Sequence, residues 1–158
     1  MPRAGLAAVV RGAVGGVAAT AAMSIVMLGA RRFGLVGKLA PEEITEDALD
    51  AAGVDRDETT EDAVTVASHL AYGTGSGVAY ALAGSRLPGP PVLRGVVFAT
   101  GLLLVSYQGW VPAARILPPL QAQTPGGRWT LIVSHLVFGA TLGAAVAALA
   151  GHSGEHPA

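Results

Sequence analysis

Residues 129–150 read WTLIVSHLVFGATLGAAVAALA, a run without a single charged side chain. A helix needs about 20 apolar residues to cross the hydrocarbon core of a bilayer, and this run supplies them. Further uncharged stretches cover residues 12–30, 63–85 and 95–114. We expect helices in all four, because lipid cannot satisfy free backbone groups and the stretches lack the alternation of barrel strands. The sequence therefore predicts an all-α integral membrane protein.

The composition agrees with this class and excludes others. The chain of 158 residues is 51% hydrophobic and 13% charged, whereas soluble domains carry roughly 25% charged residues. It has no cysteine, which excludes disulfides, thiolate chemistry and cysteine-ligated metals. The formal net charge of −1 gives no reason to expect a nucleic-acid partner.

Four transmembrane helices would account for most of the chain, so we expect residues 1–158 to form a single membrane domain with the architecture of a four-helix bundle. The polar loop 31–59 separates the first two helices. Within it, Pro41 would begin and Gly53 would end a short amphipathic helix at the membrane surface. The transmembrane helices are predicted over residues 12–30, 60–86, 93–111 and 129–150.

One passage of the sequence occurs twice. Residues 68–73 read SHLAYG, and residues 134–139 read SHLVFG at the corresponding point of the last helix. The pairs Arg11-Gly12 and Arg94-Gly95 open the first and third helices in the same way. The pattern favours two duplicated helical hairpins that run parallel to each other, as in some transporters.

Small residues recur at four-residue spacing in the predicted helices. Helices associate in lipid through close backbone approach, which such faces allow. We interpret these faces as internal seams of the bundle, with homo-oligomerisation as the alternative. The spacing is seen at Gly12 and Gly16, at Gly73 and Gly77, and at Gly139 and Gly143.

The two repeated histidines fall at one depth of the predicted bundle. Counting along each helix places His69, His135, Ser24 and Gln108 at the same level, with Tyr107 close to it. Ionisable residues inside a membrane are functional candidates by default. The simplest interpretation is that neutral histidines bond to neighbours and fix the helix register. Alternatives are a pocket for a small ligand or lipid headgroup, and haem held by both histidines.

Catalysis and metal binding have less support from the sequence. Adjacent residues such as Ser134 and His135 diverge around a helix, and no acidic residue within the uncharged stretches could orient either histidine. No carboxylate or third histidine joins the pair to complete a metal site. We therefore predict neither an enzyme nor a site for a divalent metal ion.

From His69 onward the layout resembles the YagU-like family of small bacterial inner-membrane proteins, whose biochemical role is undefined. This resemblance covers about residues 60–150 and implies a multi-pass protein of the bacterial cytoplasmic membrane, with lipid as its surroundings. The matching features are His69 with Tyr80, the proline turn after the second helix, Gly95, Gly109-Trp110-Val111-Pro112, Leu117-Pro118-Pro119, Ser134-His135 and Phe138-Gly139.

The sequence leaves three functions open. The first expectation is a structural or accessory membrane component without enzymatic activity. The second is a protein that binds haem or another small ligand through His69 and His135, with Ser24, Tyr107 and Gln108 beside them. The third is a small transporter or channel, for which the apolar half away from the histidines offers no polar path.

Overall fold

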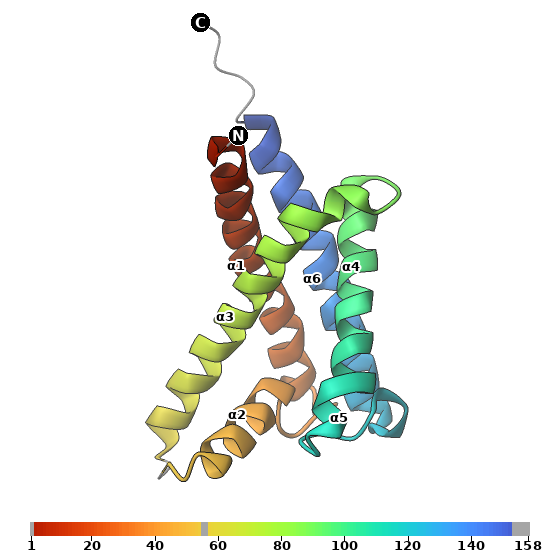
Figure 1. Ribbon diagram of the computed structural model, residues 1–158. Helices are drawn as coiled ribbons and strands as arrows, with labels where there is room; N and C mark the ends of the chain where they lie inside the picture. Colours follow the sequence, from red (N-terminus) through yellow and green to blue (C-terminus); the bar gives the residue numbers. More distant parts are fainter. Residues whose placement is uncertain (1, 55–56, 153–158) are drawn as a thin grey trace, which may run out of the picture.

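The computed structural model describes residues 2–54 and 57–152, and this part of the chain is helical without any strand. Five long helices form the body of this described part of the chain (Figure 1). They are α1 (Pro2–Arg32), α2 (Ala40–Ala51), α3 (Glu58–Ala83), α4 (Pro91–Val105) and α6 (Pro125–His152). Short turns connect them, namely η1 (Gly84–Arg86), η2 (Ser106–Trp110), α5 (Val111–Ala113) and η3 (Leu120–Ala122).

Three helices are long and apolar enough to cross a membrane, which supports the prediction of a membrane protein. They cover Gly5–Arg32, Pro91–Ala113 and Pro125–Gly151. The predicted helix over residues 60–86 forms as α3, but it does not reach the same hydropathy. Histidine, tyrosine and the Gly73-Thr74-Gly75-Ser76-Gly77 run dilute its apolar residues. The four-helix transmembrane bundle is therefore not confirmed.

The connection between α1 and α3 contains the predicted short helix, α2. Pro41 lies in its first turn, and Gly53 follows it with a φ of 66°. Glycine adopts this left-handed conformation at little cost, which suits a helix end. Asp57 then begins α3, because its side chain accepts the backbone N–H of Thr60 at 2.8 Å. This hydrogen bond lowers the pKa of Asp57 below its usual value.

The long helices pack in a row rather than in a closed square. The close pairs are α1 with α3, α1 with α6, and α4 with α6. Helices α3 and α4 are thus the two ends of the row. They lie close at the η1 turn and diverge toward their other ends, where α2 lies between them (Figure 1).

Glycines form the crossing of α1 with α3. A Cβ built on Gly16 would lie 2.9 Å from the Cα of Thr74, and one on Gly77 would lie 2.7 Å from the Cα of Gly16. Such distances leave no room for a side chain. The predicted small-residue face is therefore an internal seam here, and the helix backbones touch through it.

The crossing of α4 with α6 uses the equivalent residues. A Cβ on Gly95 would lie 2.8 Å from the backbone nitrogen of Gly143, and one on Gly139 would lie 2.8 Å from the Cβ of Ala99. Gly95 corresponds to Gly12 in the sequence repeat, and both touch the backbone of their partner helix. This shared packing supports the interpretation of two duplicated hairpins.

Substitution at two glycines of α3 tests the crossing. Gly77→Ala should lower the free energy of unfolding by about 1–3 kcal/mol, because the added methyl group overlaps α1. Gly75→Ala is the matched control, since its Cβ would meet nothing within 4 Å. That variant should be neutral or more stable, by up to about 1 kcal/mol. Unfolding of the detergent-purified proteins by heat or SDS measures both, and equal effects would contradict the described packing.

Candidate functional site: a cavity between the diverging helices

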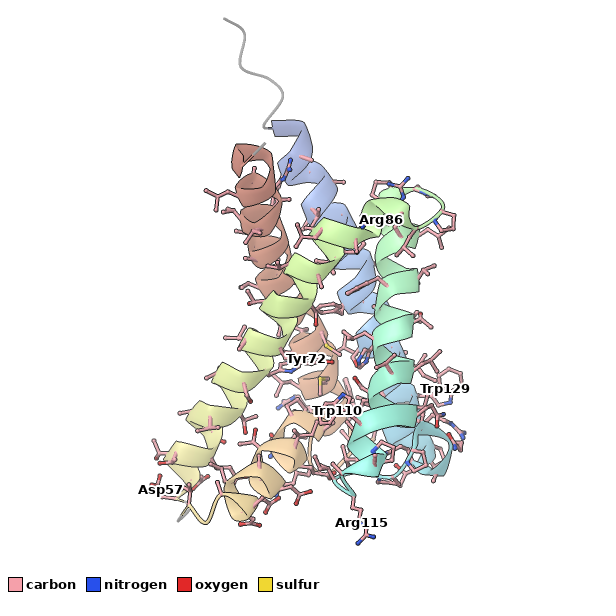
Figure 2. All side chains as sticks on the ribbon, viewed as in Figure 1. Asp57, Tyr72, Arg86, Trp110, Arg115 and Trp129 are labelled. Atoms are coloured by element: carbon pink, nitrogen blue, oxygen red, sulfur yellow. The ribbon has the colours of Figure 1, made fainter. Side chains whose placement is uncertain are left out.

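A cavity of about 210 Å³ lies where α3 diverges from α4. All five main helices contribute to its wall, and most of the contributing side chains are apolar. Figure 2 shows Tyr72 of α3 and Trp110 of η2 at this level of the molecule. The lining residues are Thr20, Met23, Met27, Ala40, Pro41, Ile44, Ser68, His69, Tyr72, Gly73, Leu102, Ser106, Tyr107, Trp110, Val111, Leu131, His135 and Phe138.

The repeated passages face each other across this cavity. His69 and Tyr72 line it from α3, and their equivalents His135 and Phe138 line it from α6. The structure thus brings together the two histidines that the sequence places at one depth. They belong to one site rather than to separate faces of the molecule.

His135 has a fixed orientation. Only 8% of the residue is exposed, and its Nδ1 lies 2.8 Å from the carbonyl oxygen of Leu131, one helical turn earlier. A carbonyl oxygen only accepts hydrogen bonds, so Nδ1 must carry the ring proton and donate it. The neutral ring then has its lone pair on Nε2. This is the arrangement that leaves an imidazole nitrogen free for a ligand.

His69 is less constrained by the protein. The residue is half-buried, and its Nε2 is shielded from solvent without a hydrogen-bond partner in the described structure. A buried polar atom without a partner costs about 1–3 kcal/mol. Nearby, the hydroxyl groups of Tyr72 and Ser106 lie 3.3 Å apart and link α3 to η2. His69 is therefore the polar group at the cavity with an unmet hydrogen-bonding demand.

A π-helical turn, η2, shapes the wall opposite α3. Inside it Gly109 departs from helical geometry, with φ −114° and ψ −107°. Such turns are frequent at functional sites, since they redirect side chains within a helix. Here the turn brings Tyr107 into the cavity, where its ring meets that of His135 edge-on with centroids 6.3 Å apart. Tyr107 was expected at this site from its depth.

Two other expected neighbours do not line the cavity. Gln108 is exposed, and its side-chain amide donates to Oε1 of Gln121 at 2.6 Å. Ser24 lies beside the cavity-lining Met23 and Met27 but faces another direction. Depth along a helix fixes the level of a residue and not its direction. Successive residues point about 100° apart, so the residue next to one that lines the cavity can point away from it.

Helix α2 covers one end of the cavity, which the sequence did not predict. Ala40, Pro41 and Ile44 line the cavity from this helix. The hydroxyl groups of Thr45 and Ser68 lie 3.5 Å apart and connect α2 to α3. The amphipathic pattern of α2 predicts that one face of this helix is buried. Nothing in the sequence indicates which surface that face covers.

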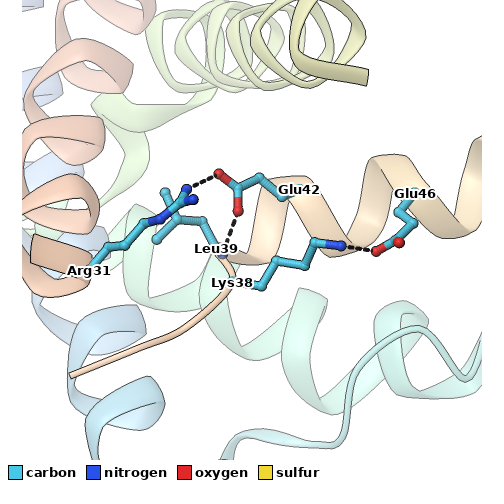
Figure 3. Close-up of polar contacts among 5 residues, drawn as sticks. All are labelled: Arg31, Lys38, Leu39, Glu42 and Glu46. Carbon is cyan, nitrogen blue, oxygen red and sulfur yellow. Dashed lines mark hydrogen bonds and ion pairs between the residues drawn. The ribbon is translucent and has the colours of Figure 1, made fainter. Parts of the chain in front are cut away.

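Polar contacts fix the start of α2 against α1 (Figure 3). Glu42 accepts from Arg31 at 2.6 Å and from the backbone N–H of Leu39 at 2.9 Å. Lys38 donates to Glu46 one turn further along the helix. These contacts hold α2 across the end of the cavity. Glu43 on the same helix is partly buried, and burial raises the pKa of its carboxyl group.

The cavity therefore offers neutral hydrogen-bonding groups in apolar surroundings. Its polar side chains are those of histidine, tyrosine, tryptophan, serine and threonine, and no carboxylate of the described residues lines it. Within residues 2–54 and 57–152, no group of three or more His, Asp or Glu side chains could hold a metal ion. Together these groups can donate to and accept from an uncharged polar head group.

Removing the contacts of Glu42 should loosen α2. Glu42→Gln weakens the pairing with Arg31, which is partly exposed and worth about 0.2–1 kcal/mol. We expect amide hydrogen exchange over residues 40–51 to rise a few-fold, with α3 and α6 unchanged. Asp47→Asn is the control, because Asp47 is exposed on the same helix. Unchanged exchange in the Glu42 variant would show that these contacts do not hold α2.

Comparison with known proteins gives one match, and it covers nearly the whole chain. No curated protein and no solved structure matches. The resemblance to the YagU-like family gains no support from these comparisons and stays a prediction. Residues 6–156 match DUF6789, a family of unknown function. The chain belongs to the DUF6789 family.

Proposed function

We propose that this protein binds a neutral, hydroxyl-bearing amphiphile from the membrane, with the hydroxyl group held between His69, Tyr107 and His135. One observation carries the proposal. The two repeated histidines line the same cavity, and one of them has a buried Nε2 without a partner. A structural role in fixing the helix register would have paired that nitrogen within the protein.

The hydrogen-bond donors and acceptors in the cavity determine which head group the ligand can have. Nε2 of His135 presents a lone pair, because Nδ1 of this ring donates to Leu131. The phenol of Tyr107 can donate or accept. A hydroxyl group satisfies both at once, since it donates to the nitrogen and accepts from the phenol. A carbonyl group has no proton for His135, and a carboxylate would meet no cation in the cavity.

The size of the cavity selects the shape of the ligand. Its volume of about 210 Å³ is below the range of about 300–1,000 Å³ for pockets that enclose a whole drug-sized ligand. A small head fits inside, and an apolar tail can pass between the diverging α3 and α4 into lipid. Exposed apolar side chains on this part of α3, including Val66 and Leu70, suit such a path.

Haem is a second candidate with a narrower basis. Two histidines on separate helices could supply both axial ligands, and His135 has the second hydrogen bond typical of a ligating imidazole. The small cavity volume argues against a macrocycle between these helices. A Soret band in protein expressed with ample haem would establish this alternative.

The proposal also covers how the chain lies in the membrane. We propose that α3 crosses the membrane as a fourth helix, since its 26 residues span about 39 Å and it packs against α1. The protein would then be a multi-pass component of the bacterial cytoplasmic membrane without enzymatic activity. A continuous polar path, which a transporter or channel needs, is not supported by the mostly apolar lining.

Tryptophan fluorescence tests the ligand proposal. Trp110 lines the cavity, and Trp129 lies outside it with 61% exposure. Trp129→Phe therefore leaves a single reporter at the site. In nanodiscs of this variant, farnesol should change the emission of Trp110 saturably. Farnesyl methyl ether, which lacks the hydroxyl proton, should bind about tenfold more weakly, the effect of one lost hydrogen bond.

Variants separate specific binding from partitioning into lipid. His135→Phe and Tyr107→Phe keep a ring in place and should each weaken farnesol binding about tenfold. Gln108→Leu is the control, because this residue faces away from the cavity. Equal affinity for alcohol and ether, or an equal loss in the Gln108 variant, would refute the proposed hydroxyl site.

A further inference from the structure

A second cavity, of about 260 Å³, lies at the opposite end of the bundle from the histidines. It is bounded by α1, α3, α4 and α6 near the η1 turn. The two arginines of the repeated Arg-Gly pairs, Arg11 and Arg94, both line it, and so does Tyr80. The duplication thus places two guanidinium groups in one hollow, just as it places two histidines in the other.

These cations have no acidic partner in the described structure. Its acidic side chains all lie between Glu42 and Asp62, near the other ends of the helices. Nε of Arg94 is buried and has no hydrogen-bond partner. Nε of Arg11 donates to the carbonyl oxygen of Ala7 at 3.2 Å, so its terminal nitrogens remain available. The hydroxyl of Tyr80 donates to the carbonyl oxygen of Pro91 at 3.1 Å and is already used.

We propose that Arg11 and Arg94 together bind a phosphate group, either the headgroup of an anionic phospholipid or free phosphate. Guanidinium groups present paired N–H donors that match phosphate oxygens, and charge-assisted bonds of this kind are the strong ones. The location favours the lipid. The glycines that follow both arginines, Gly12 and Gly95, begin the uncharged stretches, so the arginines lie at the boundary between hydrocarbon and headgroups.

Thermal unfolding of the detergent-purified chain tests this site. Dioleoyl phosphatidylglycerol should raise the unfolding temperature of the wild-type protein saturably, and dioleoyl phosphatidylcholine should do so far less. Arg11→Gln and Arg94→Gln should each raise the lipid concentration needed for half of the shift about tenfold. Arg86→Gln is the matched control, since Arg86 is exposed at the same end of the molecule but does not line the cavity.

Sodium phosphate in place of lipid identifies the source of the anion. A shift with phosphate alone that both arginine variants lose would assign the site to free phosphate. A shift that Arg86→Gln loses equally would mean general attraction to a basic surface, and it would overturn the proposal. If the variants do not fold, native mass spectrometry of the wild-type protein tests the site by comparing how well it retains the two lipids and phosphate. Equal retention of the two lipids, with no bound phosphate, would also overturn it.

Discussion

The close approach of helix backbones at glycine is the constraint on which the rest of this structure depends. In lipid, helices gain nothing from hiding apolar side chains, so they associate where their backbones can touch. Here the close contacts of α1 with α3 extend from Gly12 and Gly77 to Thr20 and Gly73, which lie at the edge of the histidine cavity. Because α3 crosses α1 there and does not run alongside it, the two halves of α3 have different surroundings. One half is tightly packed, and the other diverges and leaves a cavity.

The repeated passages of the sequence contribute matched residues to this cavity. If Gly12 is aligned with Gly95, then Met23 aligns with Ser106 and Met27 with Trp110, and all four residues line the cavity. The repeated passages of α3 and α6 contribute His69 and His135 in the same way. The cavity is thus surrounded by equivalent positions of two hairpins.

Local sequence patterns predicted the helices and the level of the site, but not the direction of each side chain. Uncharged stretches and the glycine spacing are local properties, so they indicated α1, α4, α6 and the contact faces. The cavity depends on the angle between α3 and α4, which arises only when helices pack. Tyr107 was expected at the site and lines it, whereas Gln108, one residue later, faces outward and bonds to Gln121. The π-helical turn that sets this difference has no simple sequence signal apart from Gly109.

The two hairpins differ in their connections, and this difference gives the molecule two unlike cavities. The second hairpin joins α4 to α6 through short turns, whereas the first inserts α2 between α1 and α3. Helix α2 carries acidic side chains and covers the end of the cavity that contains the histidines. No comparable helix covers the end with Arg11 and Arg94, where the described carboxylates are absent. One cavity is lined by uncharged side chains and partly covered by α2, and it suits an uncharged head group. The other is lined by two arginines without a carboxylate among the described residues, and it suits a phosphate group.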